Sequence, residues 1–314
     1  MRVRLVFLAF VGLICLLSIA AADNAEKDKK RIVLIAGPRS HGYQAHEHNA
    51  GCILLAELLN ENMPNIEAVA HTNGWPKDPE ALDGADAVAI YCDGGVRHVV
   101  MKHLEEMDKL AKKGVGIAFI HYAVEVPKDK AGKYMLEWTG GYFETYWSVN
   151  PHWKADFKKL PKHPITRGVK PFAIDDEWYY HMRFVEGMKN VAPILTAIPP
   201  ESTRKHDDGP HRGNEHVRAR TGIPEHVAWA MERPDGGRGF GFTGGHWHYN
   251  WAHNDFRKLI LNALVWIAGV EVPPEGVPSK APSFEKLEMN QDYEKPDNWN
   301  WDGIRKKLGL DTDN

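Results

Sequence analysis

Nearly continuous apolar runs alternate with helical segments in the first 120 residues, and this alternation constrains the fold more than any other feature. Three runs, 31–37, 85–92 and 115–120, are almost entirely apolar, and 66–70 reads as a further strand. The segments 50–60 and 99–112 repeat apolar residues at helical spacing. Strands that are apolar on both faces must be covered on both, so the pattern predicts an α/β fold with a parallel sheet between helical layers.

The second half of the chain is more irregular. Residues 122–170 are rich in Gly, Trp, Tyr and Pro and predict an aromatic-rich insertion. Further strands are expected at 191–196, 226–231 and 239–243, a long loop at 199–222, and an amphipathic helix at 255–267. The main domain would therefore span 31–270. Repeated prolines then predict an extended tail over 271–314, in which a short helix is expected at 301–308.

The first 22 residues have the pattern of a secretory signal peptide. A charged start precedes an apolar run, Leu5 to Ala22, whose last three residues are small. We therefore expect residues 1–22 to be cleaved, residues 23–30 to form a short linker, and the protein to be secreted or periplasmic. An uncleaved anchor is the alternative, because the run is close to spanning length. We expect no membrane span in the mature chain, because no later segment is long and apolar enough to cross a bilayer.

Composition narrows the classes of partner. The formal net charge is −3 at pH 7 and no basic patch stands out, which argues against nucleic acid. The cysteines beyond the leader, Cys52 and Cys92, lie in apolar segments and are expected to be buried free thiols. The 17 histidines fall mostly beside loop-forming residues. No feature indicates an oligomeric state.

Several strands are followed directly by chemically active residues. Ligands of open α/β sheets bind at the carboxyl ends of strands. His121 and Tyr122 follow one such strand, and His246, Trp247 and His248 follow another. Both groups should therefore line one crevice. Gly94 and Gly95 follow a third strand, where they predict either an anion pocket or a tight turn.

Three further groups complete the candidate site. His46 and His48 flank a carboxylate and are either metal ligands or polar caps of a helix. The acidic run 175–177 does not suit a simple strand, so Glu177 is expected to face the site as base or ligand unless the run is a solvated turn. Aromatic rings beside polar groups suit sugar rings, although a surface mini-core would look the same. The members of this third group are Trp138, Glu144, Trp147, His152, Trp153 and Trp178.

Taken in order, these segments resemble the trehalose-utilisation (ThuA-like) family. The resemblance covers roughly residues 31–270 and is carried by Gly116–His121, Gly140–Glu144, Asn150–His152, His163–Gly168, Asp176–Tyr179, His226–Trp229 and Gly244–His246. With its leader, the chain is similar to the secreted branch of sugar-degrading bacteria. The resemblance implies a flavodoxin-like three-layer α/β/α sandwich, as in class I glutamine amidotransferases.

The resemblance also limits the chemistry. Those amidotransferases carry a nucleophilic cysteine on the turn where this chain has His121, so glutamine hydrolysis is not expected. The family is associated with trehalose and related disaccharides, through 3-keto sugars. The leading hypothesis is an enzyme that acts on a disaccharide or 3-keto sugar by proton transfer, with His121, Glu177 and His246 as acids and bases.

Two alternatives stay open. One is a metal-dependent hydrolase or lyase whose divalent ion is held by a histidine cluster that includes His46, His48 and His248. The other is a carbohydrate-binding protein without catalysis.

Overall fold

The computed structural model describes residues 29–310, so the expected signal peptide lies outside the described residues. A seven-stranded sheet has the order β2-β1-β3-β4-β11-β10-β9. The first five strands are parallel, and β10 is antiparallel to both of its neighbours. In that order the bounds are Ile66–His71, Lys30–Ala36, Ala87–Tyr91, Gly116–Ile120, Arg238–Phe242, Glu225–Glu232 and Val191–Ala197.

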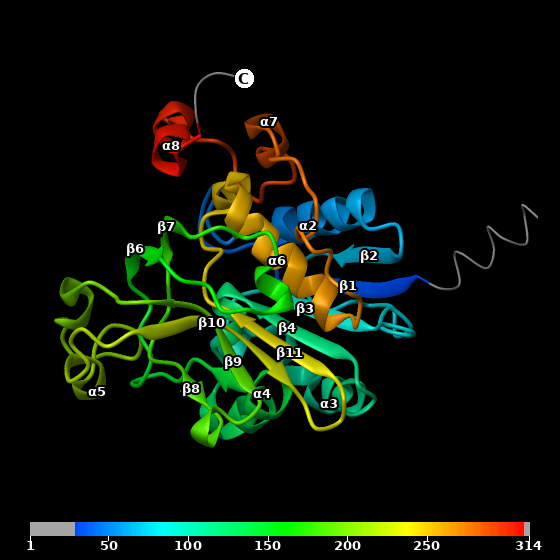
Figure 1. Cartoon of the computed structure of the whole chain (residues 1–314), viewed down its shortest axis with the longest axis horizontal. Helices are drawn as coiled ribbons and strands as arrows, with labels where there is room; N and C mark the ends of the chain where they lie inside the picture. Colours follow the sequence, from blue (N-terminus) through cyan, green and yellow to red (C-terminus); the bar gives the residue numbers. More distant parts are fainter. Residues whose placement is uncertain (1–28, 311–314) are drawn as a thin grey trace, which may run out of the picture.

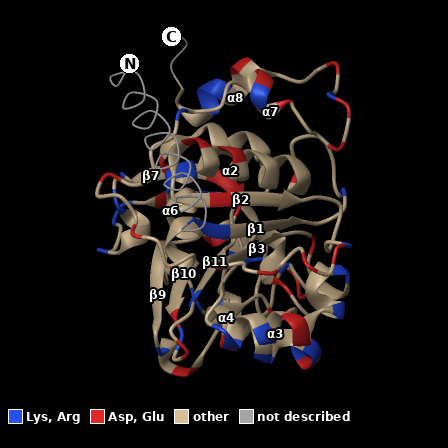
Figure 2. Ribbon diagram, turned by 90° about the vertical axis from the view of Figure 1, so that its right-hand side faces the viewer, with Lys and Arg blue, Asp and Glu red and all other residues tan. Residues whose placement is uncertain are grey.

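Helices cover the sheet on both faces (Figures 1 and 2). α2 (His48–Asn62) and α6 (Asn254–Ile267) lie on one face, and α3 (Leu104–Lys112) and α4 (Lys133–Thr139) lie on the other. Successive strand residues point to opposite faces. Ile32 and Leu34 accordingly join one core and Val33 and Ile35 join the second. The predicted flavodoxin-like three-layer sandwich is confirmed.

The aromatic-rich insertion predicted over 122–170 extends to Phe184, and it forms two small antiparallel sheets. β6 (His152–Phe157) pairs with β7 (Phe172–Glu177), and β5 (Gly141–Tyr142) pairs with β8 (Arg183–Phe184). The acidic run 175–177 ends β7, so the prediction that it does not suit a strand is wrong. The physical reason is that the buried Asp176 carboxylate accepts the backbone N–H groups of Gly245 and His246, each at 2.9 Å.

Short helical turns connect these elements. The predicted helix 99–112 is divided at His103 into a 3-10 turn and α3. The segment 199–222 is not one plain loop, because it contains a 3-10 turn and α5 (Glu215–Arg218). A π-helical turn spans Lys128–Gly132, and the 3-10 turns are Gly95–Arg97, Val99–Lys102, His121–Val124, Pro164–Thr166, Glu186–Met188, Glu201–Arg204 and His248–Ala252.

The C-terminal segment packs on the domain. Beyond residue 270 it carries α7 (Phe284–Leu287) and the predicted helix α8 (Trp301–Leu308), and the Leu287 side chain is buried in the core beside α2 and α6. Cys52 and Cys92 are free and buried, as expected. Within residues 29–310, no helix has the length and apolar character needed to cross a membrane.

Candidate functional site

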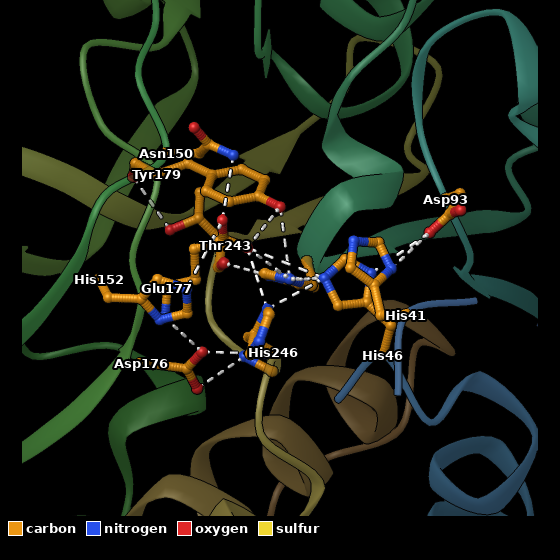
Figure 3. Close-up of polar contacts among 12 residues, drawn as sticks. His41, His46, Asp93, Asn150, His152, Asp176, Glu177, Tyr179, Thr243 and His246 are labelled. Carbon is orange, nitrogen blue, oxygen red and sulfur yellow. Dashed lines mark hydrogen bonds and ion pairs between the residues drawn. The ribbon is translucent and has the colours of Figure 1, made fainter. Parts of the chain in front are cut away.

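Four side chains from distant segments converge at the carboxyl edge of the sheet (Figure 3). His46 comes from the loop after β1, His121 directly follows β4, Glu177 ends β7 and His246 follows β11. One nitrogen or oxygen atom of each lies within 4.8 Å of the others. Three of the four segments follow strands of the main sheet, which is where α/β sheets bind ligands. We call these residues the four-residue cluster.

The distances within the cluster match those between ligands of one metal ion. His46 Nε2 is 3.0 Å from both His121 Nε2 and His246 Nδ1. Glu177 Oε2 lies 3.0 Å from His246 Nδ1, 3.4 Å from His121 Nε2 and 3.8 Å from His46 Nε2. With metal–ligand bonds of about 2.0–2.1 Å, neighbouring ligand atoms are about 3.3 Å apart in a tetrahedral site and about 2.9 Å apart in an octahedral one. The cluster therefore has the size of a site for a divalent ion.

In His121 and His46, the partner of the Nδ1 atom determines whether the Nε2 atom, which faces the cluster, has a lone pair or a proton. His121 Nδ1 lies 2.8 Å from the carbonyl oxygen of Thr243, so Nδ1 carries the proton and Nε2 has a lone pair. His46 Nδ1 faces the Asp93 carboxylate at 3.3 Å, with the same result. Two lone pairs thus face each other across 3.0 Å and repel, unless a cation or an extra proton lies between them. Metal-binding histidines typically have such outer partners.

The backbone of the site is held in an unusual conformation. His46 and His121 have left-handed φ values of 52° and 57°. Such residues cost about 1–3 kcal/mol each and persist where the surroundings hold them, often at functional sites. His46 N–H donates to the His246 carbonyl at 2.9 Å, and Ala45 forms a β-bridge with Trp247. The two loops therefore fix each other.

Two carboxylates, the buried Asp93 and the partly buried Glu177, make the site electronegative. Burial by itself would raise the pKa of Glu177, but the N–H groups that His121, His246 and His46 can turn toward it when no ion is bound outweigh burial and hold that pKa far below its usual range. Asp93 has the same balance, because hydrogen bonds from His46 and Ser40 overcome burial and lower its pKa. Both carboxyl groups are therefore ionised at neutral pH. With neutral imidazoles, the site would attract a cation.

Partly exposed side chains form a rim around the cluster. The partly exposed His41 ring stacks on His46 with centroids 3.5 Å apart, and its partial burial and repulsion from His46 lower its pKa to about 4. On the other side, His152 Nε2 is 3.9 Å from Glu177 Oε1. The half-buried rings of Trp247 and Tyr122 lie near His246 and His46, with centroids 4.4 and 6.0 Å apart. The rim can thus offer both stacking surfaces and proton donors or acceptors to a substrate.

Three of the tryptophans predicted to bind a sugar lie in the hydrophobic cores and not at the rim of the cluster. Trp138, Trp153 and Trp178 are 1%, 5% and 0% exposed and pack in the two cores. Trp153 Nε1 donates to the carbonyl oxygen of Trp178 at 2.9 Å, and Trp178 Nε1 donates to that of Ile174 at 3.2 Å. The insertion satisfies these N–H groups internally. The prediction for these three residues is therefore corrected, since their rings are not available to a sugar.

Glu144 and Trp147 also serve the structure. Glu144 accepts hydrogen bonds from Arg183 at 2.8 and 3.1 Å and from Lys128 at 3.0 Å. The Arg183 guanidinium lies 3.3 Å from the Trp147 ring centroid, and His181 stacks on the same ring system. These contacts hold the insertion together and do not reach the four-residue cluster.

The Gly94-Gly95 segment is a tight turn. A Cβ atom on Gly94 would lie 2.4 Å from the carbonyl oxygen of Tyr122, so glycine is required for close packing. The Gly95 N–H already donates to the Glu125 carbonyl at 3.0 Å. The anion pocket that the sequence left open is therefore not formed by this N–H group.

Of the three histidines predicted as metal ligands, only His46 joins the four-residue cluster. His48 Nδ1 faces the Pro38 carbonyl at 3.2 Å, and its Nε2 atom is 3.8 Å from Asp93. His248 is buried behind the loop, where its backbone N–H donates to Gln44 at 2.8 Å. Burial lowers the pKa of both His48 and His248 to about 3.

Sequence reasoning missed four residues that contact the cluster. Asn150 Nδ2 donates to Glu177 Oε1 at 3.0 Å, and the Tyr179 hydroxyl lies 3.3 Å from both Glu177 Oε2 and His121 Nε2. His41 and Asp93 are the other two. Asp93 could have been found, since it follows β3 and the rule that selected His121 applies to it equally.

Comparison with known proteins agrees with this fold. The ThuA family model, described as trehalose utilisation, matches residues 33–267. A ThuA-like protein from Bacteroides uniformis superposes with a TM-score of 0.52 at 14% identity, covering 76% of this chain and 91% of that one. A ThuA-like protein from Parabacteroides merdae gives 0.52 at 15%, covering 85% and 98%. A search of the curated proteins gives no match. Because the family model spans most of the chain, the protein belongs to the ThuA (trehalose utilisation) family.

Proposed function

We propose that the protein is a divalent-metal-dependent enzyme of carbohydrate metabolism. His46, His121, His246 and Glu177 would be the metal ligands. The observation that carries the proposal is the 3.0 Å separation of the His46 and His121 Nε2 atoms beside the Glu177 carboxylate, at which two imidazole lone pairs would repel. The description of the family as one of trehalose utilisation supports a sugar as the substrate.

The ligand set narrows the choice of ion. A bound divalent ion would polarise a sugar carbonyl or hydroxyl group, or activate water. Four protein ligands complete a tetrahedral site, whereas catalytic sites keep a position open. An ion that accepts five or six ligands therefore suits catalysis here, and imidazole nitrogen favours Fe, Co or Ni over Mg or Ca, with Mn²⁺ as a further candidate.

The rim supports a disaccharide or a 3-keto sugar as the substrate class. Trp247 is partly exposed beside the cluster, and an indole ring there suits the C–H face of a sugar ring. His41 and His152 lie on different sides of the cluster (Figure 3). A keto group acidifies the adjacent C–H, and a positioned imidazole that removes this proton contributes about 10²–10⁴-fold to the rate.

The same atoms would allow a metal-free alternative. An extra proton between His46 and His121 would also relieve the repulsion of their lone pairs, and His121, Glu177 and His246 would then act directly as acids and bases. A carbohydrate-binding role without catalysis would need only the rim. Metal content and turnover distinguish the three.

The experiment begins with protein purified after growth with Mn, Fe, Co, Ni and Zn. We expect about one equivalent of metal by elemental analysis, and its loss in His121→Gln and Glu177→Gln. His103→Gln is the control, because His103 pairs with Glu106 at 3.0 Å on the surface of α3. Each protein is then incubated with glucosides and their 3-keto forms. If metal-free protein converts one of these sugars, the proposed metal requirement is wrong. If metal-loaded protein converts none of them, the proposed reaction is wrong.

We also propose that the protein is secreted or periplasmic. The support is the leader-like segment 1–22. Expression of the full chain followed by fractionation and amino-terminal sequencing tests it. A mature protein that begins near Asp23 outside the cytoplasm is expected, and a cytoplasmic protein that retains Met1 would refute it.

A further inference from the structure

We infer that the C-terminal segment Leu287–Asp292 positions the metal ligand His46, although none of its side chains belongs to the four-residue cluster. This inference rests on the proposed metal site. The segment begins at the last residue of α7, which packs on the α2–α6 side of the sheet (Figures 1 and 2). It therefore reaches the loop after β1 from outside the main domain.

The loop that carries His46 needs support from its surroundings. His41, Gln44 and His46 have φ values of 61°, 63° and 52°, a conformation that side chains disfavour. Three such residues within six positions would relax if the loop were free. The loop after β11 supplies one support, since His46 N–H donates to His246 at 2.9 Å and His248 N–H donates to Gln44 at 2.8 Å.

The C-terminal segment supplies the second support, on the residue two positions before His46. Gln44 N–H donates to Gln291 Oε1 at 3.1 Å and shares that proton with Glu47 Oε1, also at 3.1 Å. Gln44 Nε2 donates to the Leu287 carbonyl oxygen at 3.0 Å. Gln44 and Leu287 are both fully buried, so water cannot replace the bond between them.

The segment also holds the residues after His46. Asp292 N–H donates to Glu47 Oε2 at 2.9 Å, and Asn49 Nδ2 donates to Asp292 Oδ1 at 2.8 Å. His46 is therefore fixed on both sides, through Gln44 before it and Glu47 and Asn49 after it. Loss of these bonds would let the backbone relax and turn Nε2 away from the other ligands.

The test uses the full chain with Gln291→Ala, which removes one of the two oxygens that accept from the Gln44 N–H group and leaves Glu47 Oε1. Gln291→Glu keeps an accepting oxygen but brings a second carboxyl group beside Glu47 and loses the Nε2 donor to Leu287, so it should restore binding only in part. Lys295→Ala, three residues beyond the segment, is the matched control, because Lys295 pairs only with Glu288, at 2.6 Å, among the described residues. Affinity for Co²⁺ is measured by competition with a chromophoric chelator, and the visible absorption of bound Co²⁺ reports its coordination.

We expect Gln291→Ala to bind Co²⁺ about fivefold more weakly, the effect of one net hydrogen bond, with an altered spectrum. The metal-free melting temperature should change no more than in Lys295→Ala. If Gln291→Ala matches the unmodified protein in affinity and spectrum, the inference is wrong while the metal site stands. The inference would also be wrong if Gln291→Ala lowers the metal-free melting temperature enough to account for the whole loss of affinity and Gln291→Glu restores none of it. If the unmodified protein binds no metal, the proposed function itself fails.

Discussion

Substitution of Asp93 is the sharpest test of the proposed metal site. Asp93 is 7% exposed and accepts the Ser40 hydroxyl at 2.8 Å. Its Oδ1 atom lies 3.3 Å from His46 Nδ1 and so keeps the proton on that nitrogen. If Asp93 becomes Ala, His46 can place its proton on Nε2, and this tautomer cannot bind a metal through Nε2. The carboxylate also contributes negative charge next to the ion.

The size of the effect follows from the geometry. Loss of an outer partner of a metal-bound histidine typically costs 10- to 100-fold in affinity. The 3.3 Å separation is longer than the about 2.7–2.9 Å of a strong charge-assisted hydrogen bond. We therefore expect the lower part of that range for Asp93→Ala, about 10- to 30-fold, or about 1.4–2 kcal/mol. Asp93→Asn keeps an accepting oxygen and loses only the charge, so about threefold is expected.

The assay is competition for Co²⁺ or Zn²⁺ with a chromophoric chelator at pH 7.5. Asp156→Ala is the control, because the Asp156 side chain is 55% exposed on β6 and pairs with Lys158 at 3.5 Å. The reasoning is supported if the unmodified protein and Asp156→Ala bind the metal equally tightly, Asp93→Asn binds it more weakly, and Asp93→Ala binds it most weakly. Equal affinity in Asp93→Ala and Asp156→Ala would show that the carboxylate does not orient His46, and the lone-pair argument would fall with it.

Three predictions concern stability, each measured by urea unfolding. Gly116→Ala places a Cβ atom 2.0 Å from the Ile267 carbonyl oxygen and should cost about 3 kcal/mol, whereas a cost near zero would mean that α6 moves freely. Glu144→Gln tests pH dependence. Burial would raise the Glu144 pKa, but hydrogen bonds from Arg183, Lys128 and Tyr142 outweigh burial and lower it. The Glu144 carboxylate therefore contributes to the free energy of unfolding above its ordinary pKa of 4.5, and this contribution is lost as the pH falls below that value. The variant should therefore lose less stability than the unmodified protein between pH 6 and 3, and parallel curves would contradict this. Arg204→Ala removes a fully buried partner of Glu225, at 3.3 Å, and should lower the free energy of unfolding by about 3 kcal/mol. A cost near zero would contradict this and would mean that Arg220, which also pairs with Glu225 at 2.7 Å, compensates for the loss.

Much of the fold could be predicted because its signals are local. The run 115–120 is apolar throughout, which requires a strand covered on both faces, and β4 spans Gly116–Ile120. Once β4 was placed as an inner parallel strand, the position of His121 at the carboxyl edge followed. The acidic run 175–177 was not expected in a strand because of its three adjacent charges, whereas it ends β7 and Asp176 is buried against backbone N–H groups that come from another loop.

The members of the site were harder to predict, because they depend on burial and backbone conformation. Trp138 and Trp247 both lie among glycines and polar residues, yet one is in the core and the other is at the rim. His46 and His48 are two residues apart, and the left-handed φ of His46 directs its ring into the cluster, while His48 begins α2 and faces Pro38. No local pattern distinguishes these pairs.

The sequence by itself determined the layered sheet and the edge at which chemistry would gather, because apolar periodicity and strand ends are properties of neighbouring residues. Only the tertiary structure decided which atoms meet there. His121 presents Nε2 because Thr243, 122 residues away, accepts from Nδ1, and His46 presents Nε2 because Asp93 does the same. A metal site depends on such orientations, and they are set by contacts between segments that are far apart along the chain.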